Sequence, residues 1–313
     1  MSDTLDDLIE EFLAWQDGVR GLSAHSVQAY RRDLSQMVRI LSAVNANFTG
    51  STPVCSVQTS DLRSCIGQLS RDKKAASSIN RFIAAVRNFF AYCRRFDYIK
   101  IDPAAELKTV KQPVRVPKFM NAAEVDDLCR CPIDNPLLWA ERDNALFEML
   151  YSSGCRVSEI AGIKLEDLSA LQDSALVRGK GGKDRRVFFS HDAVVSLKRY
   201  MQEREKRLRE LGLLQAGKNP AALFINWKGT NLSARGIRFI ISRYSSAEGT
   251  NRHVSPHVFR HTFATAMIGA GADIRTVQEM LGHSSISTTQ RYTHVTTAQL
   301  KALYNRAHPH GTK

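Results

Sequence analysis

The chain has 313 residues, of which 43% are hydrophobic, so it is long enough for one large domain or two ordinary domains with real cores. Lys and Arg outnumber Asp and Glu by 44 to 31, giving a formal net charge of +13. This excess favours a polyanionic partner because Lys and Arg displace counterions from phosphates, although a membrane surface or an acidic protein also fits. No apolar run approaches transmembrane length and the acidic start is unlike a signal peptide, so we expect a cytoplasmic protein.

The six cysteines form no recognisable metal or disulfide pattern. No Cys-x-x-Cys pair occurs, and the one close pair, Cys129 and Cys131, lacks a second pair or a nearby histidine. Free thiols are typical of a reducing compartment. We expect these two to be small, buried or half-buried side chains, with no metal.

The first hundred residues contain four stretches with the apolar spacing of helices. They cover residues 5–19, 26–44, 61–69 and 77–92. The step Asp102-Pro103 stops the pattern, so we expect a small helical domain over residues 1–107.

The polar positions of these helices are mostly cationic, and few acids accompany them. A solvated face is the ordinary explanation of such a charge run, but the excess favours a surface that faces DNA. The candidate DNA contacts are Arg31, Arg32, Arg81, Arg87, Lys111 and Arg115. The last two belong to residues 108–119, whose prolines and cations predict an extended linker that could cross a DNA backbone between two clamping domains.

A second domain is expected over residues 120–313. Asn121, with Glu124 three positions later, predicts a capped helix start. Strands are expected at 175–179 and 185–189, joined by a turn that carries Lys180, and a further short strand at 223–226. Helices are expected at 142–152, 156–163, 192–211, 233–245, 256–268, 274–281, 288–292 and 297–307.

The second domain also contains the groups that an attack on a phosphodiester needs. Tyr292 can be the nucleophile, and its phosphate ester would store the energy of the broken bond for rejoining. Arg156 and Arg260 can grip the non-bridging oxygens with paired donors, which lysine cannot do. These residues therefore predict a site that cuts and rejoins DNA without metal or ATP.

Three further side chains complete this candidate site. His283 can donate to the same phosphate, and His257 can bond it or help to deprotonate the tyrosine. Lys180, flanked by glycines in the expected turn, can reach into a groove and protonate the leaving 5′ oxygen.

Each of these residues also has an ordinary explanation. Tyr292 alone would be a half-buried tyrosine. His257 and His261 lie one helical turn apart, as in a metal pair, but the adjacent Arg260 would repel a cation, so we expect a structural His261. Arg156 could simply pair with Glu159, which could also hold it in its working rotamer.

The segment Lys180-Gly-Gly-Lys183 also suggests a phosphate-cradling loop. It lacks the fuller glycine-rich pattern of nucleotide-binding loops, so nucleotide binding is disfavoured.

Five segments of the second domain are informative together: 153–160 (SGCRVSEI), 179–185 (GKGGKDR), 257–261 (HVFRH), 281–284 (LGHS) and 291–294 (RYTH). In order and spacing they resemble the tyrosine recombinases of the phage-integrase family. The four-helix first domain and the ending from Tyr304 to Pro309 resemble the bacterial Xer recombinases, the XerC type more than the XerD type. Cys155 and Gly182 depart from the usual Leu and Asn, and the Cys155 thiol suggests sensitivity to oxidants.

The resemblance implies a mostly α fold with a small β-sheet (α+β), arranged as a C-shaped DNA clamp. It has an N-terminal helical, SAM-like core-binding domain and a catalytic domain whose tail helix docks into a neighbouring protomer. It further implies a 3′-phosphotyrosyl link to the nucleophile Tyr292 in a site completed by Arg156, Lys180, His257, Arg260 and His283, with Glu159 in support and no cofactor.

The resemblance also implies partners and a biological role. Four protomers, including a sister recombinase, would act on two DNA sites through a Holliday junction, with the septal DNA translocase as activator. The expected role is resolution of chromosome or plasmid dimers at a dif-like site during chromosome partition and cell division. The integrase of a mobile element, a non-cleaving DNA-binding protein and a type IB topoisomerase remain alternatives.

Overall fold

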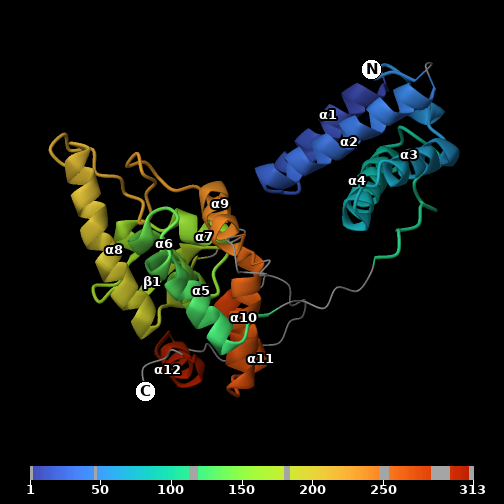
Figure 1. The fold of residues 1–313 in the computed structure, drawn as a ribbon. Coiled ribbons are helices and arrows are strands. Elements are labelled where there is room, and N and C mark those ends of the chain that lie inside the picture. The colour runs from blue at the N-terminus through green and yellow to red at the C-terminus, as the bar shows by residue number, and fades with distance from the viewer. Residues whose placement is uncertain are drawn as a thin grey trace. The chain divides into compact units, whose positions relative to one another are not determined.

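The computed structural model describes residues 3–45, 48–112, 119–179, 184–246, 254–282 and 297–309. The chain divides into two compact units, residues 1–115 and 116–313, and both are mostly helical (Figure 1). The only sheet among the described residues has two strands. The predicted fold class, mostly α with a small sheet, is therefore confirmed. None of the helices in the described ranges has the length and apolar character needed to cross a membrane.

The described part of the first unit is a bundle of four α-helices with one short 3-10 turn. The helices are α1 (Leu5–Gly18), α2 (Ala24–Val44), α3 (Thr59–Arg71) and α4 (Ala76–Arg95), and the turn is Val54–Ser56. Thr4 and Ser23 cap the first two helices by accepting hydrogen bonds from backbone amides. The apolar positions of α4, spaced three and four apart, are buried in the core of the bundle, as at Phe82, Val86 and Phe89.

The second unit places a buried helix at its centre. Its elements are α5 (Ala122–Asp134), α6 (Ala140–Ser153), α7 (Val157–Gly162), a 3-10 turn (Leu165–Asp167), β1 (Ser174–Arg178), β2 (Asp184–Phe188), α8 (His191–Glu210), α9 (Ala234–Ser245), α10 (Pro256–Gly269), α11 (Ile274–Leu281) and α12 (Thr297–Ala307). Every residue of α6 from Arg142 to Ser153 is buried, and α5, α8 and α10 pack around it. The predicted capping box of Asn121 and Glu124 begins α5.

The central helix ends where three elements meet. Gly154 stops α6 in the left-handed conformation, with a φ of 59°. An added Cβ there would lie 2.5 Å from Phe263 of α10 and 2.9 Å from Leu281 of α11. The close approach of α6, α10 and α11 at this point therefore depends on glycine. The next two residues in the chain, Cys155 and Arg156, directly follow this junction.

The two strands form an antiparallel hairpin in which Val177 pairs with Arg185 and Arg178 pairs with Asp184. Each strand starts and ends one residue before the predicted range. The predicted strand at 223–226 is wrong for the described structure, where isolated bridges join Lys164 to Ala222 and Ile225 to Asn231. The segment changes its bonding partner along its length, so no continuous ladder forms.

The tail helix α12 packs on its own unit. Tyr304 and Ala307 are buried against a small cluster that includes Phe188 of β2 and Phe263 and Met267 of α10. This packing occupies the apolar face of α12 within a single chain. Docking of this helix into a neighbouring protomer stays a prediction.

Candidate active site

Two of the predicted arginines converge on one short stretch of backbone. Arg156 is the N-cap of α7, and its guanidinium donates to Glu159 at 2.8 Å and to the carbonyl of Gly282 at 3.3 Å. Arg260, on α10, donates to the carbonyls of Gly154 at 2.8 Å and Leu281 at 2.7 Å. The fold thus brings together two side chains that are far apart in the sequence, beside the end of α11.

The electrostatics of this cluster are strongly cationic. Burial, followed by the charge of Arg156, lowers the pKa of Arg260 to about 10. A guanidinium with that pKa is still protonated at neutral pH, so the site holds two positive charges in partial burial. Such a cluster stabilises an anion, because each charge is only partly screened by water.

Glu159 is the acid within this cluster. Its buried carboxylate accepts four hydrogen bonds, from the backbone amide and guanidinium of Arg156 and from two nitrogens of Arg185, at 2.7 to 2.9 Å. Burial alone would raise the pKa of Glu159, but these hydrogen bonds outweigh it and hold the pKa below its ordinary value. The predicted pairing of Arg156 with Glu159 is present.

Arg185 is the member of the cluster that our reading of the sequence missed. Besides its two bonds to Glu159, its Nε donates to the carbonyl of Met280 at 2.9 Å. The hairpin offered one clue to Arg185. Residues paired across a hairpin lie on the same face of the sheet, and Val177, which pairs with Arg185, is buried. The sequence alone does not show which residues pair between the two strands, so it does not distinguish the half-buried Arg185 from the exposed Arg186.

The two histidines of α10 lie in different surroundings. His257 is exposed in the first turn, three residues before Arg260 and so on the same side of the helix. His261 lies against the ring of Phe119, with centroids 6.2 Å apart. Among the described residues, no group of three or more His, Cys, Asp or Glu side chains could hold a metal ion.

Three predicted catalytic residues, Lys180, His283 and Tyr292, lie outside the described residues, as do Arg115 and the predicted helix 288–292. For Lys180 and His283, the preceding residue in the chain is described. Gly179 and Asp184 flank the segment of Lys180, and Gly282, whose carbonyl accepts from Arg156, directly precedes His283.

The Cys155 thiol is buried beside the arginines. Burial raises its pKa to about 11, so only a very small fraction is thiolate at neutral pH. This environment disfavours the predicted sensitivity to oxidants. Cys129 is buried and Cys131 half-buried, as expected.

Four of the six candidate DNA contacts, all in the first unit, have partners within the protein. Arg31 pairs with Glu10 and Arg81 with Asp33, on neighbouring helices. Arg87 donates to the carbonyl of Leu107 and Arg32 to that of Gln28, while Lys111 is exposed. The two acids are distant in the sequence from the arginines that they pair with, so the sequence alone did not reveal them.

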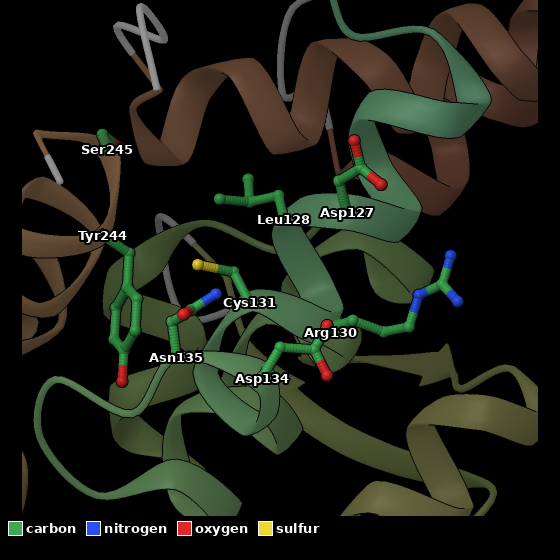
Figure 2. A pocket seen from close by; sticks show the side chains of 8 residues that line it. All are labelled: Asp127, Leu128, Arg130, Cys131, Asp134, Asn135, Tyr244 and Ser245. Atoms are coloured by element: carbon green, nitrogen blue, oxygen red, sulfur yellow. The ribbon is translucent and has the colours of Figure 1, made fainter. Parts of the chain in front are cut away.

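A hollow of about 430 Å³ lies between α5 and the end of α9 (Figure 2). Its lining includes Asp127, Arg130 and Tyr244. Among the described residues, none of the predicted catalytic side chains lines it. We therefore place the candidate site at the arginine cluster.

The sequence matches two family descriptions, "Phage integrase family" over residues 118–299 and "Phage integrase, N-terminal SAM-like domain" over residues 9–95. It is 41% identical to the tyrosine recombinase XerC of Treponema denticola, over 98% of this chain and 100% of that protein. It is 34% identical to the tyrosine recombinase XerD of Listeria monocytogenes, over 97% and 99%.

Solved structures support the fold. A lambda integrase fragment, determined as a dimer bound to a COC′ core site, matches with a TM-score of 0.66 at 15% identity, over 94% of this chain and 100% of that chain. A lambda integrase tetramer bound to a Holliday junction also matches with a TM-score of 0.66, at 16% identity over 93% and 80%. With full-length relatives and a family match over most of the second unit, this chain belongs to the phage integrase family and is a tyrosine recombinase of the Xer type.

Proposed function

We propose that this recombinase cuts and rejoins DNA at specific sites through a 3′-phosphotyrosyl link and a Holliday junction. The observation that carries the proposal is the convergence of Arg156 and Arg260 beside Gly282, the residue before His283. A guanidinium has five N–H donors, and the bonds described for each arginine use two of them. Donors therefore remain for the oxygens of a phosphate.

In the proposed reaction, the Tyr292 oxygen forms a bond to phosphorus while the bond from phosphorus to the 5′ oxygen breaks. Lys180 supplies the proton that the 5′ oxygen takes up, and His257 accepts the phenol proton or bonds to the phosphate. Arg156 and Arg260 neutralise the non-bridging oxygens, with His283 as a further donor. One phosphate ester replaces another, so rejoining needs neither ATP nor a metal.

We also propose the biological role, because the relatives with high identity are XerC and XerD proteins over their whole length. The recombinase would resolve chromosome or plasmid dimers at a dif-like site, acting with a sister recombinase in a tetramer and under the control of the septal DNA translocase. Recovery of the DNA bound in cells would test this role. Recovery of mobile-element ends instead of one chromosomal site would overturn it.

A nicked DNA substrate tests the chemistry. The short fragment beyond the nick diffuses away after cleavage, so the protein stays trapped on the 3′ side of the break. We expect the wild type to be trapped with and without EDTA, and Tyr292→Phe to bind DNA without becoming attached. Tyr304 is the next tyrosine along the chain, so Tyr304→Phe, which keeps the buried ring, is the matched control and should still be trapped. Trapping of Tyr292→Phe would show that another residue is the nucleophile.

A further inference from the structure

Arg185 makes three separate connections inside the second unit. It is the second residue of β2, and its side chain is only 14% exposed. Its two terminal nitrogens each donate to one oxygen of Glu159 at 2.9 Å, and its Nε donates to the carbonyl of Met280 at 2.9 Å. This is the bidentate geometry that a planar guanidinium provides and an ammonium group does not.

The carboxylate that holds Arg185 also holds Arg156. Glu159 accepts the backbone amide of Arg156 at 2.7 Å and its guanidinium at 2.8 Å. The hairpin and the start of α7 are therefore fastened to the same two oxygens. A shift of Arg185 would move the carboxylate or leave it partly unpaired, and either change would reach Arg156.

The third connection joins the hairpin to the end of α11. Arg185, Arg260 and Arg156 donate in turn to the consecutive carbonyls of Met280, Leu281 and Gly282. The last carbonyls of a helix have no partner within the helix, so these guanidiniums satisfy them. Gly282 also leaves room for Arg185, because an added Cβ would lie 3.1 Å from a terminal nitrogen of that arginine.

We propose that Arg185 is a positioning residue that fixes the start of β2 relative to Arg156, and that cleavage assisted by Lys180 depends on this anchor. The inference rests on the proposed function, in which Lys180 protonates the leaving oxygen. Because Arg178 pairs with Asp184, the segment that contains Lys180 connects the two strands next to Arg185. A small displacement of a catalytic group costs about a hundredfold in rate, so an anchor at the base of the hairpin affects the chemistry directly.

The test compares Arg185→Lys with Arg186→Lys on two DNA substrates. Arg186 is the matched control because it is the next residue of the same strand, is exposed, and contacts only the hydroxyl of Ser174 among the bonds described. One substrate is ordinary nicked DNA, and the other carries sulfur in place of the 5′ bridging oxygen. A thiolate is a far better leaving group than an alkoxide, because a thiol has a pKa of about 8.5, so it departs without a proton from Lys180.

We expect Arg185→Lys to bind DNA within about twofold of the wild type and to cleave the ordinary substrate about a hundredfold more slowly. On the sulfur substrate its defect should shrink to about tenfold or less, and Arg186→Lys should behave as the wild type on both. An equal loss on both substrates would overturn the inference, since it would indicate damage to the whole site. Unchanged cleavage of the ordinary substrate would overturn it as well.

Lys180→Ala separates this inference from the proposed function. Cleavage by Lys180→Ala should also recover on the sulfur substrate. If it does not, the proposed role of Lys180 as the proton donor is wrong. Hydrogen exchange then tests the anchoring by Arg185 independently of DNA cleavage. In Arg185→Lys, the amides of β2 and of residues 280–282 should exchange about tenfold faster, and those of α8 should not change. Unaltered exchange in β2 would contradict the anchoring itself.

Discussion

The guanidinium of Arg260 reaches across from α10 to the carbonyl of Leu281, at 2.7 Å, in the last turn of α11. The same side chain holds the carbonyl of Gly154 at 2.8 Å. One arginine therefore joins the ends of two helices that meet at the candidate active site. Replacing it should affect the placement of neighbouring groups as well as the binding of a phosphate.

Arg260→Lys should lose at least about a hundredfold in cleavage while still binding DNA, because a lysine cannot make the paired bonds. The residual activity should depend on pH. The burial and the neighbouring Arg156 that lower the pKa of Arg260 to about 10 would lower the pKa of a lysine there as well. Trapping rates of the variant should fall between about pH 7 and 9 relative to the wild type. A ratio that does not change with pH would show that the lysine stays charged.

Glu159→Gln should destabilise the second unit by about 3 kcal/mol at neutral pH, because it leaves two arginines around a neutral amide. Trp15 is the only tryptophan of the first unit, so urea unfolding followed by fluorescence in a Trp15→Phe background reports on the second unit. Glu166→Gln, at an exposed position, is the control.

The same comparison should depend on pH in a defined direction. The pKa of Glu159 is lowered in the folded protein, so its stabilisation is complete above its ordinary pKa of about 4.3 and is lost as the pH falls through the folded value. The difference between wild type and variant should be constant from about pH 6 to 8 and shrink in acid. A difference that widens in acid would contradict the assigned cause.

Gly154→Ala should cost about 3 kcal/mol in the second unit, since the left-handed conformation disfavours a side chain and the new Cβ would overlap Phe263. Gly162→Ala is the control, because nothing lies within 4 Å of its Cβ position. Urea midpoints measure both. Equal midpoints would show that α6, α10 and α11 can separate at little cost.

Tyr304→Ala should release the tail helix, because removing a buried aromatic ring costs about 3 to 5 kcal/mol. Rapid proteolysis of the tail and binding of a hydrophobic dye to the exposed cluster around Phe188 would reveal it. Lys301→Ala removes only a partly exposed ion pair with Asp173, worth at most about 1 kcal/mol, and should leave the tail protected. Equal protection of both variants would show that other contacts hold α12.

Salt titrations of DNA binding should separate the cations of the first unit. Lys111→Ala should reduce the slope of log affinity against log salt by about 0.9 if Lys111 contacts a phosphate. Arg81→Ala should reduce the slope by less, because Asp33 already offsets the charge of Arg81. Identical reductions would indicate that Arg81 leaves Asp33 when DNA binds.

Much of the fold could be predicted from the sequence, because the buried positions of helices such as α4 and α12 recur every three or four residues. The pairing of Arg156 with Glu159 was also accessible, since the two are one turn apart. Arg185 was not, because its role depends on a hairpin register and on Met280, which is distant in the chain. The acidic partners of Arg31 and Arg81 could not be predicted either, because ion pairs between helices leave no local pattern in the sequence.

Each unit buries its own apolar core, one around Phe89 and the other around Phe147. A substitution that loosens the first core therefore removes no packing from the side chains that surround Arg156 and Arg260. If the four-helix unit contacts DNA as predicted, substitutions on its surface change which DNA sites are bound while the core around Phe147 keeps its packing.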